Sequence, residues 1–144
     1  MSEIITISVQ CSTNASVIWN ALTNVEHHKK WYFDIQDFAL EKEATFSFYE
    51  PGDNKKFKHV CTIVDVVPNK LFSHTWTYPE LSKGSSLVTW QLKEENGITE
   101  VSITHKGIES FADGGPDFAI ENFVAGWNEI LHKDLKNYVE NNQI

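Results

Sequence analysis

The chain has 144 residues, a length typical of one domain that buries most of its apolar surface. Hydrophobic residues make up 41% and charged residues 22%, as in ordinary globular proteins, and a formal net charge of −8 argues against nucleic acid and anionic membranes as partners. Five Trp and nine Phe supply large rings that must either fill an interior or line a space inside it.

The N-terminal segment predicts a β-strand. Residues 3–11 alternate apolar and polar side chains, with Ile5, Ile7 and Val9 on the dry face. Glu3 stands where a signal peptide would carry positive charge, so we expect a cytoplasmic protein. No apolar run in the chain approaches the roughly 20 residues of a membrane helix, so no membrane insertion is expected.

Two short helical segments are expected next. Asn14 stands at a helix N-cap position ahead of residues 15–24, which carry an apolar stripe. Residues 25–33 predict a second short helix or a turn. The two cysteines, Cys11 and Cys61, lack the spacing of a zinc or redox motif, which favours two buried thiols and leaves a disulfide open.

Strand and turn signals fill the middle of the chain, from residue 37 to residue 106. Asn96-Gly97 lies between two alternating runs and is a strong signal for a two-residue hairpin, because both residues tolerate positive φ. Connections this short predict an antiparallel meander. Its strands are expected in the runs ATFSFYE, FKHVCTIVDVV, KLFSHTWTY, SLVTWQLKE and ITEVSITHK.

The last segment predicts one long amphipathic helix of roughly 22 residues, about 33 Å long. It follows Gly114-Gly115-Pro116, and its apolar stripe is expected to contain Ile120, Phe123, Val124, Trp127, Ile130, Leu131, Leu135 and Tyr138. Strand, two short helices, antiparallel strands and a long helix give an α+β fold in a single domain over residues 1–144.

Several segments, taken in order, resemble the START-like, or SRPBCC, superfamily, and within it the group named after the activator of the heat shock protein 90 ATPase homologue. They are VIWNALTN at 17–24, KWY at 30–32, VVPNKLFSHTW at 66–76, LVTWQL at 87–92, TEVSITHKG at 99–107 and GWNEILHKDLKNYV at 126–139. The resemblance implies a helix-grip fold of the birch-pollen-allergen type, with a curved antiparallel sheet wrapped around the C-terminal helix. It also implies a cavity for lipids, sterols, polyketides or other hydrophobic compounds.

Strand parity predicts which side chains enter that cavity, because residues two apart share a face. His74 and His105 fall on faces that are otherwise apolar. The predicted ligand-binding residues are Trp31, Tyr32, Phe72, His74, Trp76, Trp90, His105, Phe123 and Trp127. The alternative interpretation is a filled core, in which the rings only pack and each neutral imidazole bonds to its own neighbours. His105, next to Gly107, would then fix the chain before the last helix.

Our first functional hypothesis is binding of a small hydrophobic or amphipathic molecule between the sheet and the C-terminal helix. The alternative is a chaperone-interacting module, although a chain of this length has no room for the additional chaperone-binding domain of the eukaryotic activators it resembles. A further alternative is a cyclase- or hydratase-like enzyme, with His74 and the acidic Asp34, Asp37 or Glu50 as acid and base. His27-His28 are adjacent and diverge on a helix, and no nucleophile elbow, phosphate loop or metal-ligand spacing occurs, so no catalytic residue, cofactor or metal is predicted.

Overall fold

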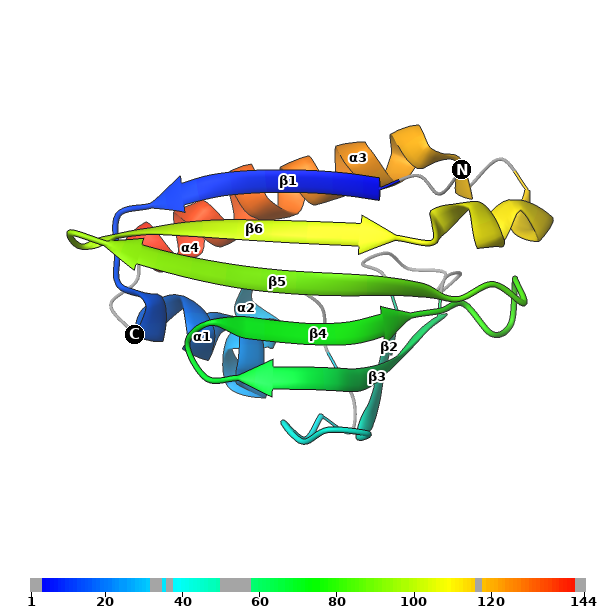
Figure 1. The fold of residues 1–144 in the computed structure, drawn as a ribbon, viewed down its shortest axis with the longest axis horizontal. Coiled ribbons are helices and arrows are strands. Elements are labelled where there is room, and N and C mark those ends of the chain that lie inside the picture. The colour runs from blue at the N-terminus through cyan, green and yellow to red at the C-terminus, as the bar shows by residue number, and fades with distance from the viewer. Residues whose placement is uncertain (1–3, 32–34, 36–37, 50–57, 116–117, 142–144) are drawn as a thin grey trace.

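A computed structural model describes residues 4–31, 35, 38–49, 58–115 and 118–141. It shows a curved, fully antiparallel six-stranded sheet with helices on one side (Figure 1). The strand order is β1-β6-β5-β4-β3-β2. The strands are β1 (Ile4–Cys11), β2 (Thr45–Tyr49), β3 (Lys58–Val67), β4 (Leu71–Trp76), β5 (Ser86–Glu95) and β6 (Ile98–Lys106). The predicted α+β meander is confirmed.

Tight turns hold the meander in register. Asn96 and Gly97 both have positive φ, 56° and 79°, as a two-residue hairpin of the primed type requires. The flanking residues Glu95 and Ile98 pair directly, which confirms the predicted hairpin. The pairing of β3 with β4 slips between Ile63 and Asp65, a bulge that bends the sheet.

The two short helices pack together after β1, as predicted. α1 (Ala15–Thr23) begins where the Asn14 side chain accepts a hydrogen bond from the backbone N–H of Val17 at 3.1 Å. Glu94 of β5 accepts from the backbone N–H of Ala15 at 2.7 Å, which ties the helix start to the sheet. α2 (Val25–Trp31) is joined to α1 by the indole of Trp31, whose Nε1–H donates to the carbonyl of Ala21 at 2.8 Å.

The C-terminal helix is continuous but not uniform. It comprises α3 (Ile120–Asn128), a π-helical segment η3 (Glu129–Leu135) and α4 (Lys136–Asn141), and it follows the short 3₁₀ segment η1 (Ile108–Gly114). In Figure 1 it runs behind β1 and β6. A π-helical bulge amounts to one extra residue within an α-helix, so it changes the direction of every side chain after it.

This bulge corrects part of the predicted stripe. In a regular α-helix Val139 would point about 120° away from Trp127, whereas one extra residue reduces the difference to about 20°. Val139 is accordingly buried together with Trp127, Leu131 and Leu135, although the 3.6-residue period did not place it in the stripe. Val124, which was expected inside, lies about 60° around from Trp127 and is 37% exposed.

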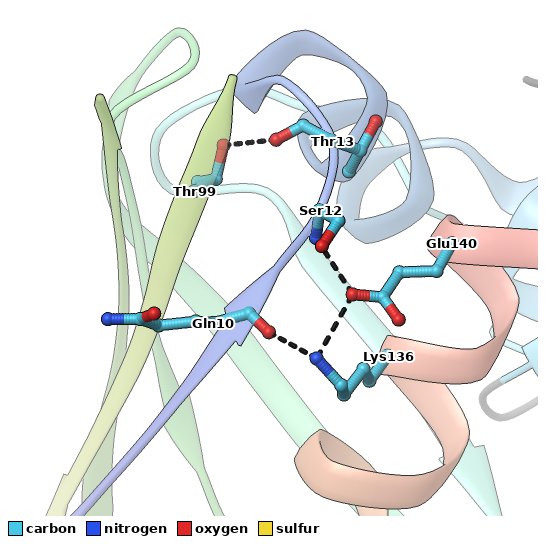
Figure 2. A network of polar contacts seen from close by, with 6 residues as sticks. All are labelled: Gln10, Ser12, Thr13, Thr99, Lys136 and Glu140. Atoms are coloured by element: carbon cyan, nitrogen blue, oxygen red, sulfur yellow. Dashed lines mark hydrogen bonds and ion pairs between the residues drawn. The ribbon is translucent and has the colours of Figure 1, made fainter. Parts of the chain in front are cut away.

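Polar contacts fasten the end of this helix to edge strand β1 (Figure 2). Lys136 Nζ donates to the carbonyl of Gln10 at 2.5 Å and contacts Glu140 Oε2 at 3.0 Å. The same carboxylate oxygen accepts from the backbone N–H of Ser12 at 2.8 Å. Two backbone groups at the end of an edge strand are thereby satisfied by side chains of the helix.

The interior contains both thiols as free, buried cysteines, as expected. Burial raises the pKa of Cys11 to about 11, so this thiol is unreactive at neutral pH. No helix among the residues that the structure describes is long and apolar enough to cross a membrane.

Two glycines give a test of the packing. A Cβ at Gly84 would lie 2.3 Å from the carbonyl oxygen of Ser110, whereas a Cβ at Gly126, within α3, would meet nothing within 4 Å. We therefore expect Gly84→Ala to lower the free energy of unfolding, by about 1–3 kcal/mol as for other overpacked sites. Gly126→Ala should raise it by up to about 1 kcal/mol, through helix propensity. Urea denaturation of both variants measures the difference; equal effects would contradict the described contact.

Candidate functional site

The side chains predicted to face inward do so. On β4 the exposed fractions of Phe72, His74 and Trp76 are 3%, 3% and 4%. On β6, Val101, Ile103 and His105 are fully buried, and on β5 Val88, Trp90 and Leu92 are buried as well. These faces lie under the helices. The inward face of the sheet therefore consists mainly of aromatic and aliphatic side chains, with two imidazoles among them.

Part of this inward face borders a small void between the sheet and the first two helices. Its volume is about 10 Å³, close to the space needed by one water molecule. The described side chains that line it are Leu22, Trp31, Ile35, Phe38, Phe46, Phe72, His74 and Trp90. Apart from the imidazole and the two indole nitrogens, they carry no polar side-chain atom.

His74 is a neutral side chain on the wall of this void. Its Nδ1 lies 2.9 Å from the carbonyl oxygen of Thr75, which can only accept a hydrogen bond. Nδ1 therefore carries the proton. Burial lowers the pKa of His74 to about 4, so at neutral pH the other nitrogen, Nε2, holds a lone pair. Within the described residues, Nε2 has no hydrogen-bond partner.

Aromatic rings surround this imidazole. The ring centroids of Phe46, Phe72 and Trp76 lie 5.3, 5.1 and 6.1 Å from that of His74. Phe38 in turn contacts Phe46 at 5.1 Å and Phe72 at 6.1 Å, both edge to face. A polar acceptor is thus set among apolar rings, beside a void with room for about one water molecule.

A second group of predicted residues packs around His105. Trp127 lies 5.1 Å from Trp76 and 5.7 Å from Trp90, measured between ring centroids, and Phe123 lies 5.4 Å from His105. Trp127 Nε1–H donates to His105 Nδ1 at 3.0 Å, which bridges α3 and β6. We call Trp76, Trp90, His105, Phe123 and Trp127 the ring cluster.

The tautomer of His105 follows from its partners. An indole nitrogen can only donate, so His105 Nδ1 accepts and Nε2 carries the proton. Nε2–H then donates to Ser86 Oγ at 2.7 Å, and Ser86 Oγ–H donates to the carbonyl of Trp76 at 2.8 Å. Burial, with smaller contributions from His74 and His59, lowers the pKa of His105 to about 3.

This arrangement has a structural consequence and a chemical one. The relay joins β4, β5, β6 and α3, so His105 fixes the chain just before it leaves the sheet, as the alternative interpretation proposed. A nucleophilic serine instead needs a histidine that accepts its proton. Here the imidazole donates to Ser86, so the pair is not arranged for nucleophilic catalysis.

The nine predicted site residues therefore divide into two sets. Trp31, Phe72, His74 and Trp90 line the void, and Trp90 also belongs to the ring cluster. Trp76, His105, Phe123 and Trp127 form the rest of that cluster. Tyr32 lies outside the described residues, as do Asp34, Asp37 and Glu50. The ligand-binding role of the set stays a prediction.

Four residues that line the void were not predicted to bind ligand. Phe46 could have been found, because it alternates with Phe48 in the strand pattern of residues 44–49. Leu22 belongs to the apolar stripe of α1. Ile35 and Phe38 come from the connection between α2 and β2, where no periodicity indicates which way a side chain points. Among the described residues, no group of three His, Cys, Asp or Glu side chains is placed to hold a metal ion.

Comparisons with known proteins agree with this architecture. The model of the family described as Activator of Hsp90 ATPase homolog 1-like protein matches residues 12–140. No curated protein matches the chain. Among solved structures, protein MLL2253 from Mesorhizobium loti has a TM-score of 0.79 at 20% identity, covering 99% of this chain and 100% of its own.

Two further structures have the same fold. The Aha1 dimer from Colwellia psychrerythraea has a TM-score of 0.74 at 22% identity over 96% of each chain. Ara h 8.0201 has a TM-score of 0.74 at 12% identity, covering 99% of this chain and 100% of its own. Together with the family match, these likenesses confirm the helix-grip fold and the resemblance noted in the sequence.

The buried neutral histidines predict that the protein loses stability in mild acid. Unfolded histidines bind protons near pH 6.5, whereas folded His74 and His105 do so only near pH 4 and pH 3. Between these values the unfolded state binds more protons, so the free energy of unfolding falls as the pH drops. Each histidine adds up to about 1.4 kcal/mol per pH unit to this slope.

Denaturant unfolding from about pH 7 to about pH 5 measures the slope. His74→Phe removes one titrating group from an aromatic site and should reduce the slope by up to about 1.4 kcal/mol per pH unit. His132→Gln, which replaces an exposed histidine of η3 outside the aromatic interior, is the matched control. An identical slope in wild type and His74→Phe would show that His74 is not held neutral by burial.

Proposed function

The chain belongs to the family of Activator of Hsp90 ATPase homolog 1-like proteins, and from this premise we propose that it binds a small hydrophobic or amphipathic molecule between its curved sheet and its first two helices. The sequence analysis expected this cavity under the C-terminal helix, but the described residues that line the void include none from that helix. The observation that carries the proposal is the small apolar void whose lining includes His74, an imidazole with one acceptor nitrogen. Deeply placed apolar sites with few polar groups are typical of small-molecule binding.

The size of the void indicates how a ligand must enter. Ligand sites usually measure about 300–1,000 Å³, far more than the about 10 Å³ described here. Binding therefore requires that one of the side chains lining the void move away and leave its volume to the ligand. Phe38 is the best candidate, because it is half-buried and comes from a connection outside the helices and strands.

Phe38 occupies the position that a ligand ring would take. Its ring packs edge to face on His28 at 5.1 Å, as well as on Phe46 and Phe72. A ligand ring in the same place would meet the same aromatic walls. Burying one ring of about 150–250 Å² contributes about 4–6 kcal/mol at most, so a ligand that binds tightly must be larger than one ring.

We expect Phe38→Ala to open the site. Toluene should bind this variant at least about tenfold more tightly than it binds wild type, because the ring no longer has to be displaced, as in other engineered apolar cavities. The variant should also lose up to about 3 kcal/mol of stability. Titration followed by amide NMR shifts measures both the affinity and the place of binding, with the largest shifts expected around Leu22, Phe46 and Phe72.

Phe123→Ala is the matched control, since it removes a half-buried ring from the ring cluster and leaves the lining of the void intact. It should not produce shifts around Leu22 and Phe72. If toluene binds Phe38→Ala no better than wild type, the void is not a ligand site.

The nearly filled void favours a second candidate function, a module that interacts with a chaperone through its surface. The family description names an activator of a heat shock protein 90 ATPase, and a related fold was solved as an Aha1 dimer. This function needs no cavity, since it rests on surface residues alone.

The chaperone function predicts that the purified chain raises the ATP turnover of heat shock protein 90. Stimulation should be retained in Phe38→Ala, which changes the interior and leaves the outer strand faces intact. A coupled ATPase assay at saturating concentrations measures the effect. Unchanged turnover would reject this candidate and would leave the ligand proposal standing.

A further inference from the structure

Resting on the proposed function, we infer that the ligand carries a neutral hydrogen-bond donor, a hydroxyl or N–H group, and that His74 Nε2 accepts this hydrogen bond. The inference names the chemical class of ligand and the residue that selects it. It follows from the protonation pattern of one buried imidazole.

The first step is the direction of the hydrogen bond that His74 already makes. Its partner, the carbonyl of Thr75, belongs to the backbone of β4 and cannot donate. The proton must therefore stay on Nδ1 as long as the strand is intact. Nε2 is left as a lone-pair acceptor, and it cannot be converted into a donor without a charge on the buried ring.

The second step concerns what this acceptor lacks. His74 is 3% exposed, and no described residue donates to Nε2. An acceptor nitrogen that is left without a partner at an apolar wall is unfavourable. A ligand hydroxyl or N–H supplies that partner, whereas an ether or carbonyl oxygen would bring a second lone pair against the first.

The third step concerns ligand groups other than a neutral donor. Among the described residues that line the void there is no carboxylate and no lysine, so a charged ligand would find no opposite charge on this part of the wall. The indole N–H of Trp31 is already used by the carbonyl of Ala21, so it is not available to a ligand acceptor. The described part of the wall therefore favours a neutral donor on a hydrophobic body, such as a phenol or an alcohol, as the partner of His74 Nε2.

Three probes of similar size distinguish donor recognition from apolar binding: 2-naphthol, 2-methoxynaphthalene and naphthalene. In wild type and in Phe38→Ala, 2-naphthol should bind about tenfold or more tightly than 2-methoxynaphthalene, as expected for one recovered buried hydrogen bond. In His74→Phe this ratio should fall to about one, while naphthalene binding changes only a few-fold. His132→Gln should keep the wild-type ratio.

A spectroscopic measurement gives a test that does not depend on how well His74→Phe folds. In protein with nitrogen-15-labelled histidine, the His74 Nε2 resonance should be that of an unprotonated nitrogen. It should move upfield with 2-naphthol and stay in place with 2-methoxynaphthalene.

The outcomes separate the inference from the function on which it rests. Equal affinities for 2-naphthol and 2-methoxynaphthalene, or a protonated Nε2, would overturn donor recognition and leave the ligand site intact. If none of the three probes binds wild type or Phe38→Ala, the proposed function fails and the inference fails with it.

Discussion

The grip of the sheet on the C-terminal helix depends on the hydrogen bond from Trp127 to His105. It is buried among rings, where water cannot replace either partner, and it forces the proton of His105 toward Ser86. That relay ends on a carbonyl of β4, so one uncharged chain of donors and acceptors connects the helix to three strands. Such a chain tolerates no added proton, which is why the interior must keep its histidines neutral.

His74 is a second buried histidine that is kept neutral, but its hydrogen bonds differ from those of His105. Both histidines are neutral and buried, but His105 has partners on both nitrogens and His74 on one. The first is therefore a structural connector, and the second is a group whose hydrogen bonding is incomplete among the described residues. The difference lies in the neighbours and not in the residue type, so inward-facing histidines on two strands of the same sheet, β4 and β6, take different roles.

Strand periodicity was sufficient to predict the sheet, the inward faces and both imidazoles, because the period of two leaves no freedom in which face a side chain takes. The void could not be predicted in the same way. Its volume depends on Ile35 and Phe38, which lie in a connection without periodicity, and on how rings from different strands interdigitate. The tautomer of His74 depends on the direction of the Thr75 carbonyl, which no residue pattern reports. Val139 was missed because one inserted residue in a helix leaves no signature in composition, whereas Val124 precedes the insertion and lies at the edge of the stripe, where the period alone does not decide burial.

That inserted residue also affects how the chain can vary in length. The π-helical segment Glu129–Leu135 contains one residue more than an α-helix would use at this point. Because of this extra residue, Trp127 before the segment and Val139 after it lie on the same, buried side of the helix. A sequence one residue shorter within this segment would need a different spacing of apolar residues, so that both halves of the helix still pack their apolar side chains against the sheet. Relatives with and without the extra residue should therefore differ in the interval between their Trp127 and Val139 equivalents, while the sheet beneath stays the same.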